Sequence, residues 1–511
     1  MPPDTAIAHT AEPPLWAKVI DHTRCIGCHA CTTACKSENE VPLSVTRTYV
    51  KYVDTGHFPQ VRRSFQVTRC NQCEDAPCVA ACPTAAMYRR ADGIVDFHKS
   101  ICIGCKACIA ACPYDAIFIN PADKSAEKCN FCAHRLDVGL EPACAVVCPT
   151  QAILVGDMND PSSAVSAIIH RDAVAVRRPE KETRPKLFYK GVDQVTLDPL
   201  AARRPDGGLF MWSEQGSVAH QVPSGHPGSW NNSAAAVLSY DVPHRAPWDW
   251  RVSAYTFTKS IAAGAYLVPF FLGVLGLLPF TSELWGLRAP VVALAALMAT
   301  GMLLVWDLEH PERFWMVLLK PQWRSWLVRG GFIITAYGLA LTLHVAATLA
   351  GRADLTLLLG WIGGALAAMT AVYTAYLFAQ ARARDLWQSP LLPPHLLVQA
   401  AVAGAAVLVL LTAPEGVDPA ITVTLRVALG AHAALALGEA SMGHPTAHAA
   451  LAASNMIKGP YGHFYWVGIA LVFLALLFAA WAPVIAALSA LGGLYLYEHA
   501  FVQAGQSVPL A

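Results

Sequence analysis

The placement of sixteen cysteines constrains the fold of this chain more than any other feature. All of them lie between Cys25 and Cys148, and the long remainder of the sequence has none. They form four groups: Cys25, Cys28, Cys31 and Cys35; Cys70, Cys73, Cys78 and Cys82; Cys102, Cys105, Cys108 and Cys112; and Cys129, Cys132, Cys144 and Cys148. Such a concentration of thiols indicates a local site rather than a chain-wide requirement.

A disulfide framework is the first alternative, because sixteen cysteines could also be oxidised in a secreted protein. The opening stretch MPPDTAIAHTAEPPLWAKVIDHTRC has no charged segment followed by an apolar one and no twin arginine. We therefore expect a protein without an export signal, and free thiols.

The spacing within the groups indicates the chemistry. CIGCHACTTAC and CIGCKACIAAC both follow the run C-x2-C-x2-C-x3-C of bacterial ferredoxins. Three thiolates on one tight loop reach three iron corners of a cubane, and the fourth points towards a neighbouring cubane. Zinc sites usually separate two C-x2-C pairs by a longer spacer. The spacing thus predicts four [4Fe-4S] clusters held by all sixteen cysteines, with a zinc-stabilised scaffold as the alternative.

Residues 18–157, and CIGCHACTTACKSENEVP in particular, resemble the four-cluster electron-transfer subunits of the molybdopterin (dimethyl sulfoxide reductase) oxidoreductase family. The resemblance implies an α+β ferredoxin-like, double dicluster domain in which the first group pairs with the fourth and the second with the third. Carried over by position, the ligand sets are Cys25, Cys28, Cys31 and Cys148; Cys129, Cys132, Cys144 and Cys35; Cys102, Cys105, Cys108 and Cys82; and Cys70, Cys73, Cys78 and Cys112.

Three polar residues beside the cysteines, His29, Lys36 and Lys106, are candidates to adjust cluster potentials. Lys36 also stands where the other groups have proline, which is a local difference that removes no ligand.

The second half of the sequence is predicted to span a membrane. From about residue 256, apolar stretches recur near the roughly 20 residues needed to cross hydrocarbon. A soluble bundle would show polar faces, and FYWVGIALVFLALLFAAWAP has none. We predict an all-α bundle of eight spans: 259–280, 289–308, 325–350, 355–380, 391–412, 419–438, 464–482 and 484–504.

The predicted organisation is a cluster domain (1–157), a connecting arm (158–250) and a transmembrane domain (251–511). The arm combines charged RRPEKETRPK with Gly-, Ser- and Asn-rich PDGGLF and PSGHPGSWNNSAAA, and it shows no sustained period of 2 or 3.6. A net charge of +1 argues against a nucleic-acid partner.

Positive charge predicts the orientation. With eight spans, the cysteine-bearing side would hold eight basic residues: Lys259, Arg313, Lys320, Arg324, Arg329, Arg382, Arg384 and Lys458. The other side would hold three: Arg288, Arg352 and Arg426. We therefore expect a bacterial inner-membrane protein with its cysteine domain in the cytoplasm, unless a partner carries the domain across the membrane.

Ionisable residues gather at the ends of spans in VWDLEHPERFWMVLLKPQWRSWLVRGGFIITAYG, where they are costly unless paired or functional. This stretch, with PWDWRVSAYTFTKSIAAGAYL and GEASMGHPTAHAALAASNMIKGPYGHFYW, resembles the NrfD family of polysulfide-reductase-type membrane anchors. The resemblance implies eight helices, no haem, and a quinone site near the surface that faces the cluster domain. Our candidate residues for menaquinone or ubiquinone are Tyr255, Lys259, Asp307, His310 and Tyr337.

Together the two resemblances imply the electron-transfer and anchor subunit of a respiratory complex, with electrons passing between membrane quinone and a molybdopterin-type catalytic subunit that meets the first cluster. That separate subunit would choose the substrate, and formate, sulfite, polysulfide, thiosulfate and arsenic compounds all stay open. The alternatives are a haem held by His344 and His432, and an ion-translocating protein with Asp307, Glu439 or Glu498 as proton relays.

Overall fold

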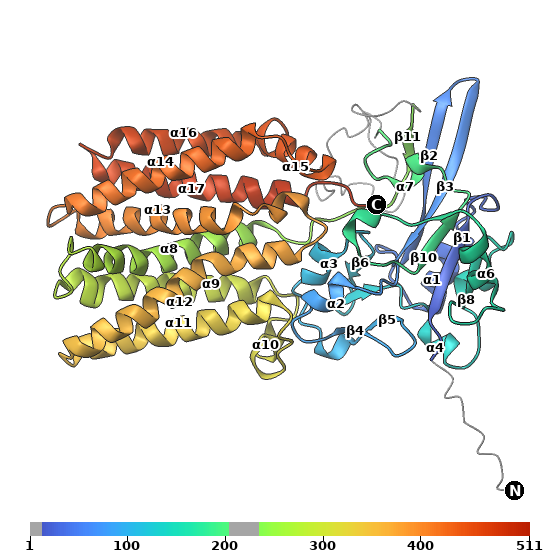
Figure 1. The fold of residues 1–511 in the computed structure, drawn as a ribbon, viewed down its shortest axis with the longest axis horizontal. Helices are drawn as coiled ribbons and strands as arrows, with labels where there is room; N and C mark the ends of the chain where they lie inside the picture. Colours follow the sequence, from blue (N-terminus) through green and yellow to red (C-terminus); the bar gives the residue numbers. More distant parts are fainter. Residues whose placement is uncertain (1–12, 204–234) are drawn as a thin grey trace, which may run out of the picture.

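A computed structural model describes residues 13–203 and 235–511, and it shows an elongated molecule with a soluble domain at one end and a helical bundle at the other (Figure 1). Residues 1–12, on which the expectation about export partly rests, lie outside the described residues. So do residues 204–234 of the predicted arm, which include PDGGLF and most of PSGHPGSWNNSAAA.

The soluble domain is built from short elements around small sheets. Its strands are β1 (Trp16–Asp21), β2 (Thr48–His57), β3 (Gln60–Arg69), β4 (Met87–Arg89), β5 (Val95–Phe97), β6 (Ile117–Ile119), β7 (Ala126–Lys128), β8 (Ile153–Asp157), β9 (Val174–Ala175), β10 (Leu187–Lys190) and β11 (Val237–Tyr240). Its helices are α1 (Ala30–Glu38), α2 (Pro77–Ala81), α3 (Ala107–Ala111), α4 (Ala133–Leu136), α5 (Ala143–Val146), α6 (Ala164–Arg171) and α7 (Gln194–Leu197).

The described part of the arm contributes strands that its sequence does not predict. In the four-stranded sheet, ordered β8-β1-β10-β9, strand β10 pairs in parallel with β1. In the three-stranded sheet, ordered β11-β2-β3, strand β11 pairs with β2. The hairpins β4-β5 and β6-β7 complete the domain. The arm is therefore woven into the soluble domain before it reaches the bundle.

The bundle confirms the α-helical prediction. Its helices are α8 (Trp250–Val274), α9 (Ala289–Trp306), α10 (Met316–Leu319), α11 (Trp326–Leu349), α12 (Ala353–Gln380), α13 (Leu392–Thr412), α14 (Pro419–Ser441), α15 (Ala447–Ile457), α16 (Gly462–Phe478) and α17 (Pro483–Gly505). Among the described residues, seven helices are long and apolar enough to cross a membrane, and α15 with α16, bent by 67°, would make an eighth.

The helix ends follow from local sequence. Asp249 caps α8 by accepting a hydrogen bond from the Arg251 backbone N–H, and Asp418 caps α14 by accepting one from the Ala420 backbone N–H. Gly276, with φ of +72°, follows the end of α8, so this helix lies earlier in the sequence than the predicted span 259–280.

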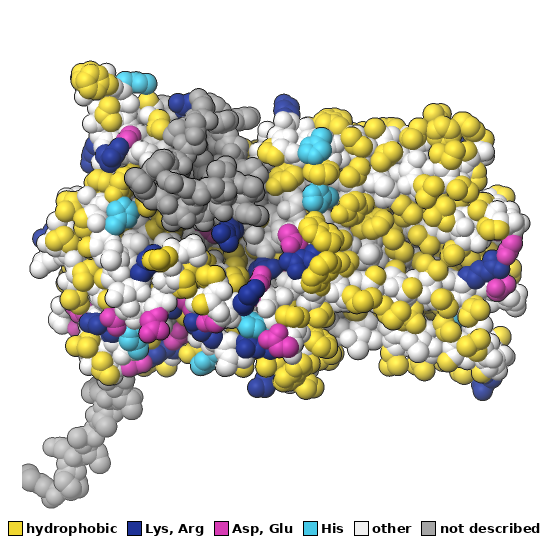
Figure 2. Space-filling view, turned by 180° about the vertical axis from the view of Figure 1, so that it is seen from behind, with side chains coloured by type: hydrophobic (Ala, Val, Ile, Leu, Met, Phe, Trp, Pro, Cys, Tyr) yellow, Lys and Arg dark blue, Asp and Glu magenta, His cyan; other side chains and the backbone are white. Residues whose placement is uncertain are grey.

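On the face seen in Figure 2, the bundle is apolar between two charged ends. Arg288 pairs with Glu415 at the end away from the soluble domain, and Arg313 contacts the soluble domain itself. Lys259, which the orientation argument counted as a loop-side charge, is instead fully buried in α8. It therefore gives no information about orientation.

Helices α8 and α13 cross at two glycines. A Cβ atom on Gly404 would lie 2.1 Å from the Gly264 carbonyl carbon, and one on Gly264 would lie 1.7 Å from the Ala400 carbonyl oxygen. Small residues allow such backbone contact between membrane helices. The crossing holds α8 tightly against α13.

We predict that Gly404→Leu destabilises the bundle by about 1–3 kcal/mol or more, because the side chain has no room at this crossing. Gly430→Leu on α14 is the matched control, since no atom lies within 4 Å of its added Cβ. Thermal unfolding of the purified protein in detergent measures both. Equal unfolding temperatures for the two variants would contradict the close crossing.

Candidate metal centres and membrane junction

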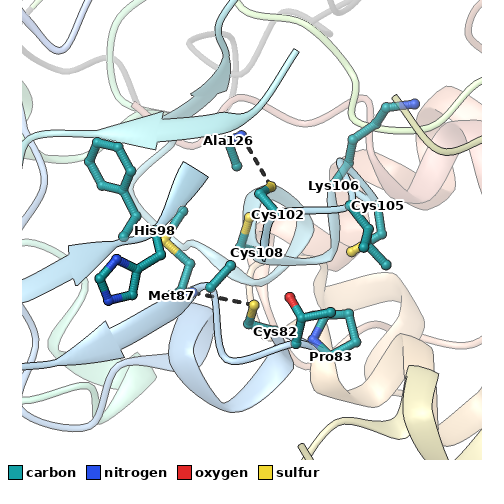
Figure 3. A pocket seen from close by; sticks show the side chains of 13 residues that line it. Cys82, Pro83, Met87, His98, Cys102, Cys105, Lys106, Cys108 and Ala126 are labelled. Atoms are coloured by element: carbon teal, nitrogen blue, oxygen red, sulfur yellow. Dashed lines mark hydrogen bonds between the residues drawn. The ribbon is translucent and has the colours of Figure 1, made fainter. Parts of the chain in front are cut away.

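Four cysteines line a small cavity between α2, α3 and β4 (Figure 3). They are Cys82, Cys102, Cys105 and Cys108, which we call the membrane site. Backbone N–H groups donate to two of the sulfurs, from Met87 to Cys82 Sγ at 3.3 Å and from Ala126 to Cys102 Sγ at 3.5 Å. The cavity joins three thiols of one group to one thiol of another.

A second small cavity repeats this arrangement at the first group. It is lined by Cys25, Cys28, Cys31 and Cys148, which we call the outer site. The Ala152 backbone N–H donates to Cys148 Sγ at 3.2 Å. This set equals one that the family resemblance implied.

The other eight thiols gather in two sets. The second site consists of Cys35, Cys129, Cys132 and Cys144, and the third site of Cys70, Cys73, Cys78 and Cys112. The Asn39 side chain lies 3.7 Å from both Cys35 Sγ and Cys132 Sγ, which places these two sulfurs side by side. At the third site, Cys112 lies close enough to Cys73 and Cys78 to raise the pKa of both thiols, after the larger effect of burial.

The loops take their shape from residues with positive φ. Gly27 and Gly104 have φ of +70° and +67°, and His29 and Lys106 have φ of 59° and 61° before α1 and α3. A Cβ on Gly27 would lie 2.3 Å from the Phe65 ring. The first and third groups therefore share one loop conformation, which turns three sulfurs towards one point.

These features fit cubane clusters. Each set offers four thiols, two sets line cavities, and backbone N–H groups point at sulfur, as is common at iron-sulfur sites. All sixteen cysteines are free thiols.

The sites differ in exposure. Cys28 at the outer site is exposed, and Cys25 and Cys148 are partly exposed. At the third site all four cysteines are buried. Of the four sites, only the outer one therefore offers an exposed cysteine to another molecule.

The membrane site lies directly against the bundle. Arg313 donates to the Cys102 carbonyl at 2.9 Å, and the Trp248 indole donates to the Cys105 carbonyl at 3.2 Å. Ser325, just before α11, donates to the Ala81 carbonyl at 2.8 Å. The loops that carry the sulfurs thus also form the junction.

Lys106 connects the membrane site to the end of α9. It extends away from the sulfurs (Figure 3), donates to the Asp307 carbonyl at 2.9 Å, and lies 3.4 Å and 3.3 Å from the carboxylates of Asp307 and Glu309. Burial raises the pKa of Asp307 to about 6, although Lys106 and Arg251 favour its charged form. The Lys106 cation is therefore compensated by carboxylates.

The five predicted quinone residues do not form one group. Tyr255 and Lys259 lie one turn apart inside α8, and Asp307 follows α9 at the junction. His310 donates from Nε2 to the Asp123 carbonyl at 2.9 Å and so faces the soluble domain. Tyr337 donates to the Ala262 carbonyl at 2.8 Å and packs against Tyr266.

A buried carboxylate completes the group around Lys259. Glu498 of α17 accepts hydrogen bonds from Thr256 at 3.0 Å and from Ser260 at 3.3 Å, two residues of α8 that are one turn apart. Lys259 itself donates to the Ala371 carbonyl at 2.7 Å. The sequence marked Glu498 only as a possible relay, because its pairing with Thr256 joins residues 242 positions apart.

The remaining candidates are engaged locally. His29 shares a 2.7 Å hydrogen bond with Tyr52, and Lys36 donates to the Pro42 carbonyl at 2.8 Å. His344 contacts the Tyr266 hydroxyl at 2.8 Å, and His432 contacts His395 at 2.9 Å. The two histidines of the haem alternative thus belong to different contacts.

Two family models match the sequence. One, described as a 4Fe-4S dicluster domain, matches residues 61–158. The other, described as polysulphide reductase NrfD, matches residues 239–507.

Curated relatives match the soluble part. A tetrathionate reductase subunit of Salmonella typhimurium is 42% identical over 209 residues, which cover 39% of this chain and 80% of the relative. A polysulfide reductase component of Wolinella succinogenes is 44% identical over 176 residues, covering 34% and 92%. The arsenate respiratory reductase iron-sulfur subunit of Shewanella is 34% identical over 219 residues, covering 34% and 94%.

If each of the four cysteine sets holds one cubane, we predict that Gly27→Ala removes about a quarter of the iron from the purified protein, because the altered outer-site loop would no longer hold a cluster. Gly139→Ala is the control: its φ of +77° is equally unfavourable for alanine, but no atom lies within 4 Å of the added Cβ. Metal analysis of both variants decides, and unchanged iron in Gly27→Ala would contradict the role of this loop.

Proposed function

This protein is a member of the NrfD family of polysulphide reductase membrane proteins and joins this domain to an iron-sulfur domain, and we propose that it conducts electrons between membrane quinone and a separate catalytic subunit. The observation that carries the proposal is the junction, where carbonyls of two membrane-site cysteines, Cys102 and Cys105, accept hydrogen bonds from the membrane domain.

Four [4Fe-4S] clusters, one at each cysteine set, would supply one-electron carriers. For zinc, four sulfurs would have to converge at about 2.3 Å from one ion. Within the described residues, no group of three or more His, Cys, Asp or Glu side chains could hold a single metal ion. This favours the larger cubane over the zinc alternative.

The sites can be ordered along the domain. The outer and second sites share α1, which carries Cys31 of the outer site and Cys35 of the second site, and Cys144 on α5 lies four residues before Cys148 of the outer site. The second and third sites meet where the Gln72 amide donates to the Cys129 carbonyl at 2.7 Å. Helices α2 and α3 join the third site to the membrane site. We infer the order outer, second, third, membrane.

Trp248 provides contact between the membrane site and the bundle. Its indole N–H donates to the Cys105 carbonyl, and its ring stacks on Trp387, with ring centroids 5.6 Å apart. Trp387 stacks in turn on Phe378 of α12. Packed aromatic rings keep water out of the junction, which supports transfer of electrons without loss to solvent.

The proposed quinone site lies between this junction and Glu498. The Tyr255 hydroxyl is buried and meets no hydrogen-bond partner of normal geometry in the described structure, so it is available to donate to a quinone carbonyl. Lys259 supplies a second donor, and Glu498 can hold a proton. Asp307, which lies beside Lys106 and Arg251 and away from the aromatic contact, would carry protons between the site and the solvent outside the junction. His310 and Tyr337, engaged elsewhere, are assigned positioning roles.

The catalytic partner is proposed to meet the outer site. The relatives are named as parts of tetrathionate, polysulfide and arsenate reductases, which supports a reductase partner, and the resemblance of the cysteine domain favours the molybdopterin type. Ile26, next to Cys25, and Val146, two residues before Cys148, are both more than half exposed and give this face apolar surface beside the exposed Cys28. We further propose a bacterial inner membrane with the cluster domain in the cytoplasm, as the basic residues of the junction side favour.

The test uses the full protein in lipid nanodiscs, reduced with dithionite, freed of reductant and mixed with a menaquinone analogue. We predict that the brown absorbance returns on mixing, and that Tyr255→Phe and Lys259→Met slow this return about 10-fold or more, because donors to the quinone are lost. Stopped-flow absorbance measures the rate.

Tyr376→Phe and Lys458→Met serve as controls, since both side chains are outside the proposed site, Tyr376 being exposed and Lys458 following α15. Reoxidation by ferricyanide but not by the quinone analogue would contradict the quinone link. Equal rates in all four variants would contradict the assignment of the site.

A further inference from the structure

The second site is distinguished by two buried cations that face one of its sulfurs. Arg69, 1% exposed at the end of β3, donates from Nη1 to Cys144 Sγ at 2.9 Å. Lys18, 2% exposed on β1, lies with Nζ 3.9 Å from the same sulfur. Two strands from different sheets thus direct positive charge to one ligand.

These charges have no carboxylate partner. Among the described residues, no Asp or Glu oxygen lies within 4 Å of the charged nitrogens of Lys18 or Arg69, and Arg69 Nε and Nη2 are buried without a hydrogen-bond partner. Lys18 instead lies over the Phe131 ring, 3.9 Å from its centroid. A buried cation is costly unless a negative group offsets it. The negative group that these two cations face is the second site.

Other buried cations near the sites are offset. Lys106 at the membrane site faces Asp307 and Glu309, and Arg47, beside Asn39 of the second site, pairs with Glu127 at 2.9 Å. Lys128 is fully buried, but its ammonium donates to the carbonyls of Val95 and Cys129, whose dipoles oppose its charge. Of the cations compared, only Lys18 and Arg69 have a charged nitrogen within 4 Å of a cysteine sulfur.

We propose that Lys18 and Arg69 set the redox order of the protein by making the second site the most easily reduced of the four. The inference rests on the proposed function, in which Cys35, Cys129, Cys132 and Cys144 hold a cluster. Reduction adds one negative charge to this site, and two fixed positive charges in a medium of low dielectric constant stabilise that added charge.

A reducible second site has a use in a two-electron reaction. Quinone and substrate each exchange two electrons, whereas each site carries one. The second site receives its electron from the neighbouring third or outer site, which is thereby oxidised by one electron. No bond is made or broken and no proton moves in this step. Lys18 and Arg69 would keep this first electron next to the outer site until the second arrives.

The test is a redox titration of the intact purified protein, followed by electron paramagnetic resonance. In the unmodified protein, the step with the most positive potential should belong to the second site, which Cys144→Ser identifies by altering its spectrum. Lys18→Met and Arg69→Met should each lower the midpoint potential of that step by at least about 59 mV. For a one-electron step, this is a tenfold fall in the ratio of reduced to oxidised site at a given potential. Lys18→Met should leave the other three steps unmoved, whereas Arg69→Met should also lower the outer-site step by a smaller amount, because Arg69 lies near Cys31 as well.

Matched variants separate charge from structure. Lys18→Arg and Arg69→Lys keep the charge. They should change the ratio of reduced to oxidised second site, at a given potential, by less than threefold. Lys106→Met removes a cation at another site and should not move this step.

Several results would overturn the proposal. One is full iron content with an unmoved step in Lys18→Met and Arg69→Met. Another is a spectrum of the most positive step that Cys144→Ser leaves unchanged, because that step would then belong to a different site. This second result overturns the proposal even if both Met variants lose iron. Fewer than four steps in the unmodified protein would contradict the proposed function instead.

Discussion

The structure depends on one constraint: each set of four thiols must converge from segments that are far apart in the sequence. Cys148 meets Cys25, Cys28 and Cys31, and Cys35 meets Cys129, Cys132 and Cys144. Because a cluster would cross-link these segments, a domain of short helices and small sheets can hold a fixed shape without one large apolar core. The β strands support the loops, and the loops aim the sulfurs.

The same constraint places the membrane domain. Loops that bend sharply around sulfur leave their carbonyl groups outward, and at Cys102 and Cys105 these carbonyls accept hydrogen bonds from Arg313 and Trp248. Gly104 shows how close the contact is, since a Cβ there would lie 2.4 Å from Glu309 Cβ. Fusion of the two domains in one polypeptide keeps this short junction assembled at any protein concentration.

Much of this arrangement could be predicted from the sequence, because it is encoded locally. The cysteine spacing and the apolar stretches depend on neighbours in the sequence, and both predictions led to the observed classes of structure. The bent pair α15–α16 was predicted only as the span 464–482, since a bend at Gly459 and Pro460 depends on packing as well as on sequence.

Long-range pairings could not be predicted. Strand β10 in the arm is only four residues long, too short for a periodic signal, and it forms because β1 offers a free edge. Lys259 looked like a residue at a helix end, but α8 starts at Trp250, which carries Lys259 into the bundle beside Ser260 and its partner Glu498. Arg69 and Lys18 drew no attention, since nothing in the local sequence shows that both face Cys144.

Iron and acid-labile sulfide analysis of the anaerobically purified protein tests the central claim most directly. Four cubanes require about sixteen irons and about sixteen sulfides per molecule. A protein that holds a few zinc ions and no sulfide would contradict the account, because no electron could then pass from the exposed outer site to the membrane.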